Sequence, residues 1–296
     1  MPGASFARHR SCHDGRVSDP GPWEDLSRPP LNVAALRRAL LRPAGDWTRV
    51  DVVATTGSTN ADLLAAARSG APDRSVLVAE HQHTARGRHG RSWSSPPRAG
   101  LTLSVLLRTG GVPVARLGWL PLLTGVALVD VLRRVAEVDA VLKWPNDVLV
   151  GGGKVAGILA EVATTTPEPT VVVGLGLNVS LRTDELPVPE ATSLHLLGAG
   201  CTDRGLLLRA LLRELAVRES SWRRAGGDPA SGLGQEYRLR CSTLGQRVRV
   251  VLPAGQVLAG RAVAVDDDGR LVVAADDAVE HVLAAGDVTH VRLTGR

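Results

Sequence analysis

Two segments of the sequence concentrate charged and polar side chains among glycines. The first, residues 82–93, reads QHTARGRHGRSW and contains Arg86, Arg88 and Arg91. Glycine lets a backbone approach a ligand closely, and arginine makes bidentate contacts to phosphate. We therefore interpret this segment as a loop that wraps an anion, with Trp93 beside it to stack on a base. A solvated basic loop is the alternative.

The second segment, residues 143–161, contains both lysines of the chain. Lysine and arginine together number 35, and only Lys143 and Lys154 are lysine. A chain that uses arginine almost everywhere else indicates that these positions need a compact ammonium group. Asp147 and Lys154 flank the glycines at 151–153, so we expect a hairpin that brings their side chains to one site. The alternative for W-P-N-D is a simple turn, which Pro, Asn and Asp favour for local reasons.

The surrounding pattern predicts strands and helices that do not alternate strictly, which is typical of an α+β fold with a mixed or antiparallel sheet. The predicted strands cover residues 49–55, 75–80, 101–107, 141–144, 147–150, 157–162 and 170–179. Helical spacing covers residues 31–42, 61–70, 114–137 and 202–222, and Ser58 or its neighbours can cap the second of these helices.

After about residue 241 the pattern changes to short alternating strands with frequent turn residues, including an Asp268-Gly269 hairpin signal. This predicts a small all-β barrel. We thus expect three parts: a disordered tail over 1–30, a catalytic domain over 31–238, and the barrel over 239–296.

Composition limits the environment and the partners. Three cysteines lie far apart, so no disulfide framework is indicated, which fits the cytoplasm. The longest apolar stretch, residues 117–129, is too short to span a membrane, and the N-terminus has no signal-peptide pattern. The net charge of +5 comes from arginines spread along the chain, so we do not expect nucleic acid to be its reason.

Five short motifs resemble those of the biotin–protein ligase family (biotin–[acetyl-CoA-carboxylase] ligases). Each is weak alone, but their order and spacing together are specific. One position departs from the family pattern, because Ala85 stands where a glycine is usual; a need for positive φ there would weaken loop closure. The motifs are S-T-N at 58–60, Q-x(3)-R-G-R-x-G-R-x-W at 82–93, K-W-P-N-D at 143–147, K-x-x-G-I-L-x-E at 154–161 and G-x-G-x-N at 174–178.

The resemblance implies a catalytic domain of the class II synthetase-like or lipoate-ligase-like fold, followed by an SH3-like β-barrel. It implies a ligase that uses ATP, biotin and Mg²⁺ to form biotinyl-5′-AMP. The biotin is then transferred to a lysine of a biotin carboxyl carrier domain of an acyl-CoA or acetyl-CoA carboxylase.

The resemblance also implies a role for each matching residue. Lys154 and the arginines would offset the repulsion between two anions, and Asp147 would take the proton of the attacking amine. Arg86 and Arg88 join these two as catalytic candidates. Biotin contacts fall on Ser58, Thr59, Asn60, Gln82, Arg86, Gly87, Arg88 and Lys154. Nucleotide contacts fall on Arg88, Arg91, Trp93, Asn146, Asn178 and Lys143.

Two alternatives stay open. A lipoate or octanoate ligase would share the fold and the acyl-adenylate chemistry, but it is expected to lack K-W-P-N-D. A bifunctional ligase and biotin-operon repressor would carry a winged helix-turn-helix ahead of the catalytic domain. Only about 45 residues precede the core, and the first 30 of them are rich in turn residues, so we expect no specific DNA binding. Because the longest apolar stretch is too short to span a membrane, we expect no membrane partner either.

Overall fold

A computed structural model describes residues 27–85, 87–253, 255–277 and 279–290. Most of the predicted tail, residues 1–26, and the predicted site residue Arg86 therefore lie outside the described residues. Residues 27–30, which the sequence pattern assigned to the tail, are described, and Arg28 is buried.

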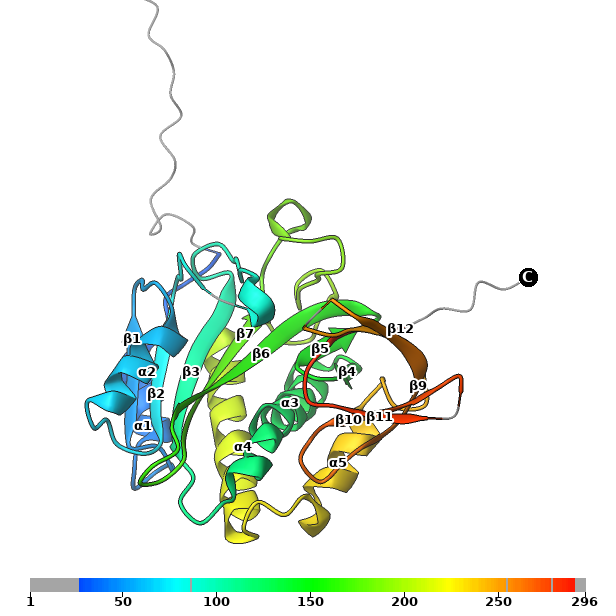
Figure 1. Cartoon of the computed structure of the whole chain (residues 1–296). Helices are drawn as coiled ribbons and strands as arrows, with labels where there is room; N and C mark the ends of the chain where they lie inside the picture. The colour runs from blue at the N-terminus through cyan, green and yellow to red at the C-terminus, as the bar shows by residue number, and fades with distance from the viewer. Residues whose placement is uncertain (1–26, 86, 254, 278, 291–296) are drawn as a thin grey trace, which may run out of the picture.

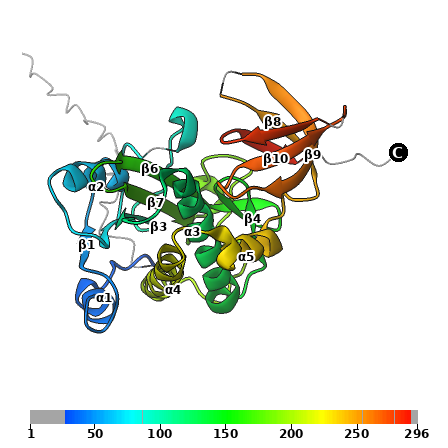
Figure 2. The same cartoon turned by 60° about the horizontal axis from the view of Figure 1, so that its bottom comes forward.

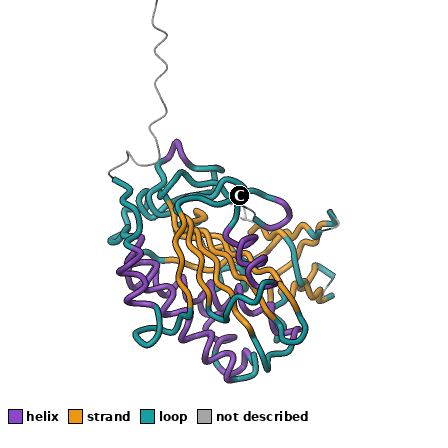
Figure 3. Tube along the Cα trace, turned by 90° about the vertical axis from the view of Figure 1, so that its left-hand side faces the viewer, coloured by secondary structure: helices purple, strands orange, loops and turns teal. Residues whose placement is uncertain are grey.

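Seven strands form one mixed sheet in the order β1-β2-β3-β7-β6-β5-β4. Strands β1 and β2 pair in parallel, and every other neighbouring pair is antiparallel. The predicted α+β class with a mixed sheet is confirmed (Figures 1 and 3). The strands are β1 Arg49–Val53, β2 Ser75–Ala79, β3 Gly100–Arg108, β4 Ala140–Lys143, β5 Asp147–Val150, β6 Gly153–Thr164 and β7 Thr170–Asn178.

The helices cover the two faces of this sheet unequally. In Figure 2, α1, α3, α4 and α5 lie on one side, and α2 lies on the other. The helices are α1 Val33–Leu40, α2 Thr59–Arg68, α3 Trp119–Val131, α4 Arg204–Arg224 and α5 Leu233–Arg240. Short turns of helix are η1 Arg88–Gly90, η2 Val114–Gly118, η3 Leu132–Ala136, η4 Thr183–Glu185 and η5 Pro229–Ser231.

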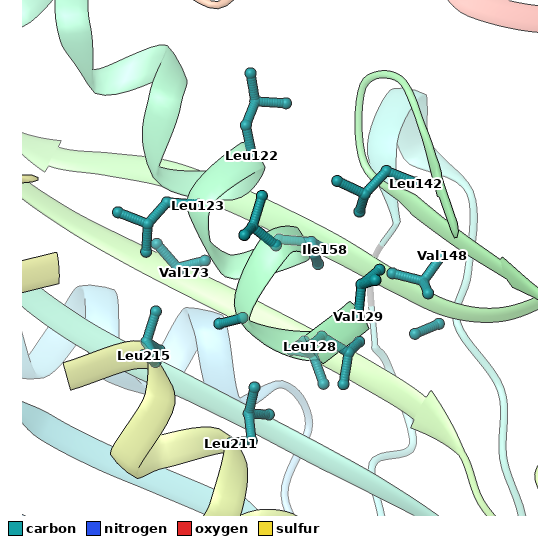
Figure 4. Close-up of a cluster of buried hydrophobic side chains, with 14 of the residues drawn as sticks. Leu122, Leu123, Leu128, Val129, Leu142, Val148, Ile158, Val173, Leu211 and Leu215 are labelled. Carbon is teal, nitrogen blue, oxygen red and sulfur yellow. The ribbon is translucent and has the colours of Figure 1, made fainter. Parts of the chain in front are cut away.

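Strand alternation separates an apolar face from a face that can hold a site. On β7, Val173 packs with Leu123 of α3 and Leu215 of α4 in the main core (Figure 4). On the opposite face, Val172 packs against α2 through Leu63. Towards the end of β7, the residues on this second face are Gly174, Gly176 and Asn178, because side chains alternate along a strand. This face of β7 therefore carries no bulky side chain from Gly174 to Asn178.

The predicted helix over 114–137 is divided into three pieces. It starts as the 3₁₀ turn η2, continues as α3 and ends in the π-helical turn η3. Apolar residues occur all round α3 because the sheet covers one side of it and α4 the other, so the helix is a core helix. The continuous helical stretch Val114–Ala136 would by length and composition alone suit a membrane span, but most of it is buried inside the protein, as in the core helix of a globular fold.

A second, antiparallel sheet has the order β11-β10-β9-β8-β12 and accounts for the predicted C-terminal barrel (Figure 1). Its strands are β8 Arg247–Val251, β9 Val257–Val265, β10 Leu271–Ala275, β11 Glu280–Leu283 and β12 Asp287–His290. The turn between β9 and β10 contacts α3, since Nε1 of Trp119, the first residue of that helix, donates to the Asp267 carbonyl at 2.7 Å. Neither β11 nor α5 was predicted.

Candidate active site

A cavity of about 650 Å³ lies over the glycine-bearing end of the large sheet. Its walls come from the start of α2, the loop 82–93, the β4–β5 turn, the β5–β6 hairpin, the segment 187–191 and the start of β12. Every predicted site residue that the structure describes lines it. These residues are Ser58, Thr59, Asn60, Gln82, Gly87, Arg88, Arg91, Trp93, Lys143, Asn146, Asp147, Lys154 and Asn178.

Glycines form the floor of the cavity, and two predicted site residues lie directly on them. A Cβ at Gly174 would overlap the Asn60 amide, and one at Gly176 would lie 2.7 Å from Nε1 and Cζ2 of Trp93. Gly157 pairs with Gly176 across β6 and β7 and would also press a Cβ against the Trp93 ring, at 3.2 Å. The glycines of the G-x-G-x-N motif thus make room for the side chains of Asn60 and Trp93, and they do not form a phosphate-binding loop.

Asn60 is held in one orientation by buried partners. Its Nδ2 donates to the Leu159 carbonyl at 3.2 Å and to Glu161 Oε2 at 2.7 Å. Its Oδ1 accepts from the Ser104 hydroxyl at 2.6 Å. Ser104, which is fully buried, has no motif that could have revealed it, whereas Glu161 is the last residue of K-x-x-G-I-L-x-E.

The first residue of the loop 82–93, Gln82, is hydrogen-bonded to the start of α2. The Thr59 amide donates to Gln82 Oε1 at 2.6 Å, and the Ser58 hydroxyl caps α2 by accepting from the Ala61 amide. The Thr59 hydroxyl lies 2.7 Å from Ser104 Oγ. Because Ser104 gives its single proton to Asn60, Thr59 must donate to Ser104. Thr59 and Asn60 therefore share one hydrogen-bond network through Ser104, here called the S-T-N network, while Ser58 caps the helix that they begin.

The loop 82–93, here called the arginine loop, is closed by hydrogen bonds between its own backbone groups. The Trp93 amide donates to Ala85 O at 3.1 Å, and the Gly87 amide donates to Arg91 O at 2.5 Å. Ala85 is buried and does not have positive φ. An alanine at this position is therefore compatible with the closed loop, so the departure from the family pattern introduces no backbone strain.

Arg88 lies among opposite and like charges at the edge of the cavity. Its Nη1 donates to Asn146 Oδ1 at 3.5 Å. Burial lowers the pKa of the Arg88 guanidinium, the carboxylates of Asp287 and Asp147 act in the opposite direction, and Arg91 adds to the lowering. Arg91 itself forms an ion pair with Asp287 at the start of β12. Asp287 was missed because no motif marks it and it lies far along the chain.

Lys154 and Asp147 meet across the β5–β6 hairpin, as the glycine turn predicted. Lys154 Nζ lies 2.6 Å from Asp147 Oδ1, and the two side chains are 32% and 19% exposed. The ammonium also lies 5.8 Å from the centroid of the Trp93 ring. A half-buried ion pair that opens on the cavity can exchange its partner for a ligand anion without first becoming an unpaired charge.

The K-W-P-N-D turn is held from both sides. Asn146 Nδ2 donates to the Ile158 carbonyl, and the Ile158 amide donates to the Asn146 carbonyl, both at 2.9 Å. From the C-terminal sheet's side, the buried Thr243 hydroxyl accepts from the Trp144 amide at 3.0 Å. These bonds fix the direction in which Asp147 leaves the turn.

Thr243 connects this turn to a histidine. Its hydroxyl lies 3.0 Å from His290 Nε2. The hydroxyl oxygen accepts from Trp144 and still has its own proton, which it can donate to an unprotonated His290 Nε2. Burial and the nearby Lys143 ammonium lower the pKa of His290, which favours the neutral imidazole ring.

Asn178 presents an unused acceptor at the wall of the cavity. The side chain is 1% exposed, and its Nδ2 donates to the Thr192 carbonyl at 2.9 Å. Its Oδ1 has no hydrogen-bond partner in the part of the chain that the structure describes. Buried acceptors are nearly always paired, so this oxygen points to a ligand that brings a donor.

Two family models match parts of this chain. A model of the Biotin/lipoate A/B protein ligase family matches residues 52–178, and a model of the Biotin protein ligase C terminal domain matches residues 243–291. The chain is 49% identical over 272 residues to the biotin--[acetyl-CoA-carboxylase] ligase of Mycobacterium tuberculosis, covering 90% of this chain and 98% of that protein. It is 30% identical over 239 residues to the bifunctional ligase/repressor BirA of Bacillus subtilis, covering 79% and 71%.

Solved structures agree on the fold. The biotin protein ligase from Aquifex aeolicus, in complex with biotin and ATP, superposes with a TM-score of 0.69 at 24% identity, covering 83% of this chain and all of that one. The family models match this chain, one relative is 49% identical over nearly the whole of both chains, and the fold is shared. The chain therefore belongs to the biotin/lipoate A/B protein ligase family.

Proposed function

We propose that this chain is an ATP-dependent biotin–protein ligase. It forms biotinyl-5′-AMP and then transfers biotin to a lysine of a carboxylase carrier domain. The observation that carries the proposal is the Lys154–Asp147 ion pair, which opens on one cavity between the arginine loop and the unpaired Asn178 oxygen. Such a cavity suits a ligand that brings an anion at one end and a donor at the other.

In the first step the carboxylate oxygen of biotin attacks the α-phosphorus of ATP, and pyrophosphate leaves. Two anions approach each other, so cations must offset their repulsion and stabilise the charge that grows on phosphorus. Lys154 is the ammonium placed for this, and Arg88 is the guanidinium on the facing loop. As the ligand anion arrives, Lys154 turns from Asp147 towards it.

The nucleotide end is the end that Asn178 and Trp93 line. An exocyclic amino group such as that of adenine would give Asn178 Oδ1 the donor that it lacks. The Trp93 ring, held flat by Gly157 and Gly176, offers a face for stacking. Biotin then occupies the end beside the start of α2 and Gln82. The S-T-N network would hold that end rigid.

In the second step the lysine ε-amine of the carrier attacks the carbonyl of the mixed anhydride, and AMP leaves. The amine must be neutral to attack and must lose a proton. Asp147 is the carboxylate beside the reacting centre, so it orients the amine and takes this proton. The loop 85–93 covers the intermediate against water, which would otherwise hydrolyse it.

Mg²⁺ fits this site as an ion carried by the nucleotide. Asp147, Glu190 and Asp287 line the cavity, but the described residues form no group of three or more potential metal ligands. Magnesium beside phosphates commonly uses only one or two carboxylates and keeps several waters. When bound, it would neutralise charge on the phosphates.

Biotin is favoured over lipoate or octanoate because residues 243–291 match a C-terminal domain described for biotin protein ligases. We assign catalysis to residues 31–238 with support from the small sheet within 239–296, and we expect a cytoplasmic enzyme. Labelled biotin, lipoate and octanoate should be offered with ATP and a carrier domain, with a carrier Lys→Arg variant as control. Biotin alone should be incorporated at that lysine. Incorporation of lipoate or octanoate instead would contradict the proposal.

A further inference from the structure

Residues 28–31, here called the strap, contact two segments that lead into the walls of the cavity. The Arg28 side chain is 6% exposed. It meets the Glu185 carboxylate with two bonds, of 3.0 and 2.5 Å, and its Nη2 also donates to the Ser180 carbonyl at 2.8 Å. A buried bidentate pair of this kind has a defined geometry and is strong because both groups are charged.

The backbone of the strap is held by the side chains of the neighbouring segments. The Leu31 amide donates to Glu80 Oε1, and the Pro29 carbonyl accepts from Arg204, both at 2.6 Å. Arg204 also pairs with Glu80 Oε2 at 2.6 Å. Glu80 is the residue directly before the loop 81–93, so the strap is joined to the root of the arginine loop.

At the Arg28 end, the strap contacts η4, which directly precedes a wall segment of the cavity. Glu185 ends η4, and its Oε2 accepts from the Arg182 amide at 2.8 Å. The chain then continues as residues 187–191, which line the cavity. That segment binds the backbone of Lys154: the Lys154 amide donates to Glu190 O at 2.7 Å, and Lys154 O accepts from the Thr192 amide at 2.9 Å.

We propose that Arg28 is a positioning residue for the nucleotide end of the active site, acting through Glu185 and the segment 187–191. Arg28 lines no part of the cavity, but it fixes where that wall starts. The inference rests on the proposed function, in which the nucleotide lies beside Asn178, whose Nδ2 donates to the Thr192 carbonyl directly after this segment. Loss of Arg28 should let the wall shift and release the adenylate, while the biotin end, held by the S-T-N network, keeps its geometry.

The test compares Arg28→Met with Arg37→Met. Arg37 also forms an ion pair near the N-terminus, with Asp51, but its side chain is 49% exposed and away from the cavity. The readouts are the rate at which pre-formed biotinyl-5′-AMP leaves the enzyme, the KM for ATP and the affinity for biotin. For Arg28→Met, adenylate release and the KM for ATP should both rise on the order of tenfold, since small misplacements far from the chemistry have effects up to that size and beyond. Biotin affinity should not change, and Arg37→Met should behave like the wild type.

Glu185→Gln provides an independent measure of the same coupling. It should produce the same selective effect, and the double variant with Arg28→Met should lose less than the two single effects combined, because both substitutions remove the Arg28–Glu185 pair. If Arg28→Met does not fold, Arg28→Lys retains a charge but not the bidentate fork, and it should show the same selectivity to a smaller degree.

Two outcomes would overturn the inference. One is normal adenylate retention and KM for ATP in folded Arg28 and Glu185 variants. The other is an equal loss of biotin and ATP binding that follows the loss of thermal stability, because that pattern belongs to a residue that supports the fold only. A wild-type enzyme that makes no adenylate at all would instead contradict the proposed function.

Discussion

Gly176→Ala tests whether the glycine floor seats Trp93 for catalysis. The added methyl group would overlap Cε2 of Trp93 and would lie 2.7 Å from Nε1 and Cζ2 of that ring, whereas van der Waals contact begins at 3.4 Å. Contact at Nε1 and Cζ2 alone requires the ring to move by 0.7 Å, and relief of the overlap at Cε2 requires more. Movement away from β7 takes the ring towards the cavity that it lines. There it would approach Lys154, whose ammonium lies 5.8 Å from the ring centroid.

The crowding at the Trp93 ring sets the expected loss of stability and of adenylation rate. Overpacking of this kind costs about 1–3 kcal/mol of stability, and a displacement near 1 Å at a reacting site lowers rates by up to roughly 100-fold. We expect pyrophosphate release in the first step to fall on the order of tenfold, with a fold that remains intact by circular dichroism.

Gly205→Ala is the matched control. Gly205 lies in the first turn of α4, away from the cavity, and a Cβ there meets only Asp203 Oδ1, at 3.2 Å. Alanine is the better helix former, so this variant should keep full activity. Normal adenylation by Gly176→Ala, in a protein whose stability has fallen as expected, would refute the role of the Trp93 seat.

Three further predictions concern the β4–β5 turn and its partners. Asp147→Asn should slow transfer from isolated biotinyl-5′-AMP by about 100-fold or more while adenylation changes little; single-turnover assays of each step would show equal slowing if Asp147 has no role as a base. Thr243→Val leaves the buried Trp144 amide unpaired and should lower the free energy of unfolding in urea by about 1–3 kcal/mol, whereas Thr243→Ser should restore it; a valine variant as stable as the wild type would count against the bond. His290 has a lowered pKa in the folded protein, so its contribution to stability is complete above its ordinary value of 6.5 and is lost as the pH falls below that value through the folded pKa. His290→Asn should remove this part of the pH dependence, and an unchanged slope between wild type and variant would contradict it.

Local patterns were sufficient to predict the elements that carry the site. Alternation placed the strands of the large sheet, and the turn chemistry at 151–153 placed the hairpin that joins Asp147 to Lys154. The helix start at Ser58 followed from its capping hydroxyl. These features depend on residues close in sequence, so periodicity and spacing report them directly.

The supporting contacts could not be predicted in this way. Thr243, Asp287 and the strap reach the site from distant parts of the chain, and nothing in their neighbouring residues marks a tertiary partner. Ser104 lies in a buried strand where a small polar residue has no distinguishing pattern. The family motifs indicated which residues gather, but not that Asn60 and Trp93 rest on glycines or that Arg91 pairs with the C-terminal sheet.

The central claim is that Lys154 makes one cavity into a site of ATP-dependent acyl activation. The most direct measurement is the ATP-dependent attachment of labelled biotin to a carrier domain, compared between the wild type and Lys154→Ala. Pyrophosphate release is followed in parallel as the measure of adenylation. The account predicts rapid transfer by the wild type, and a Lys154→Ala protein that loses adenylation but still transfers biotin from supplied biotinyl-5′-AMP. Normal adenylation by Lys154→Ala, or a wild type that labels the carrier without ATP, would contradict it.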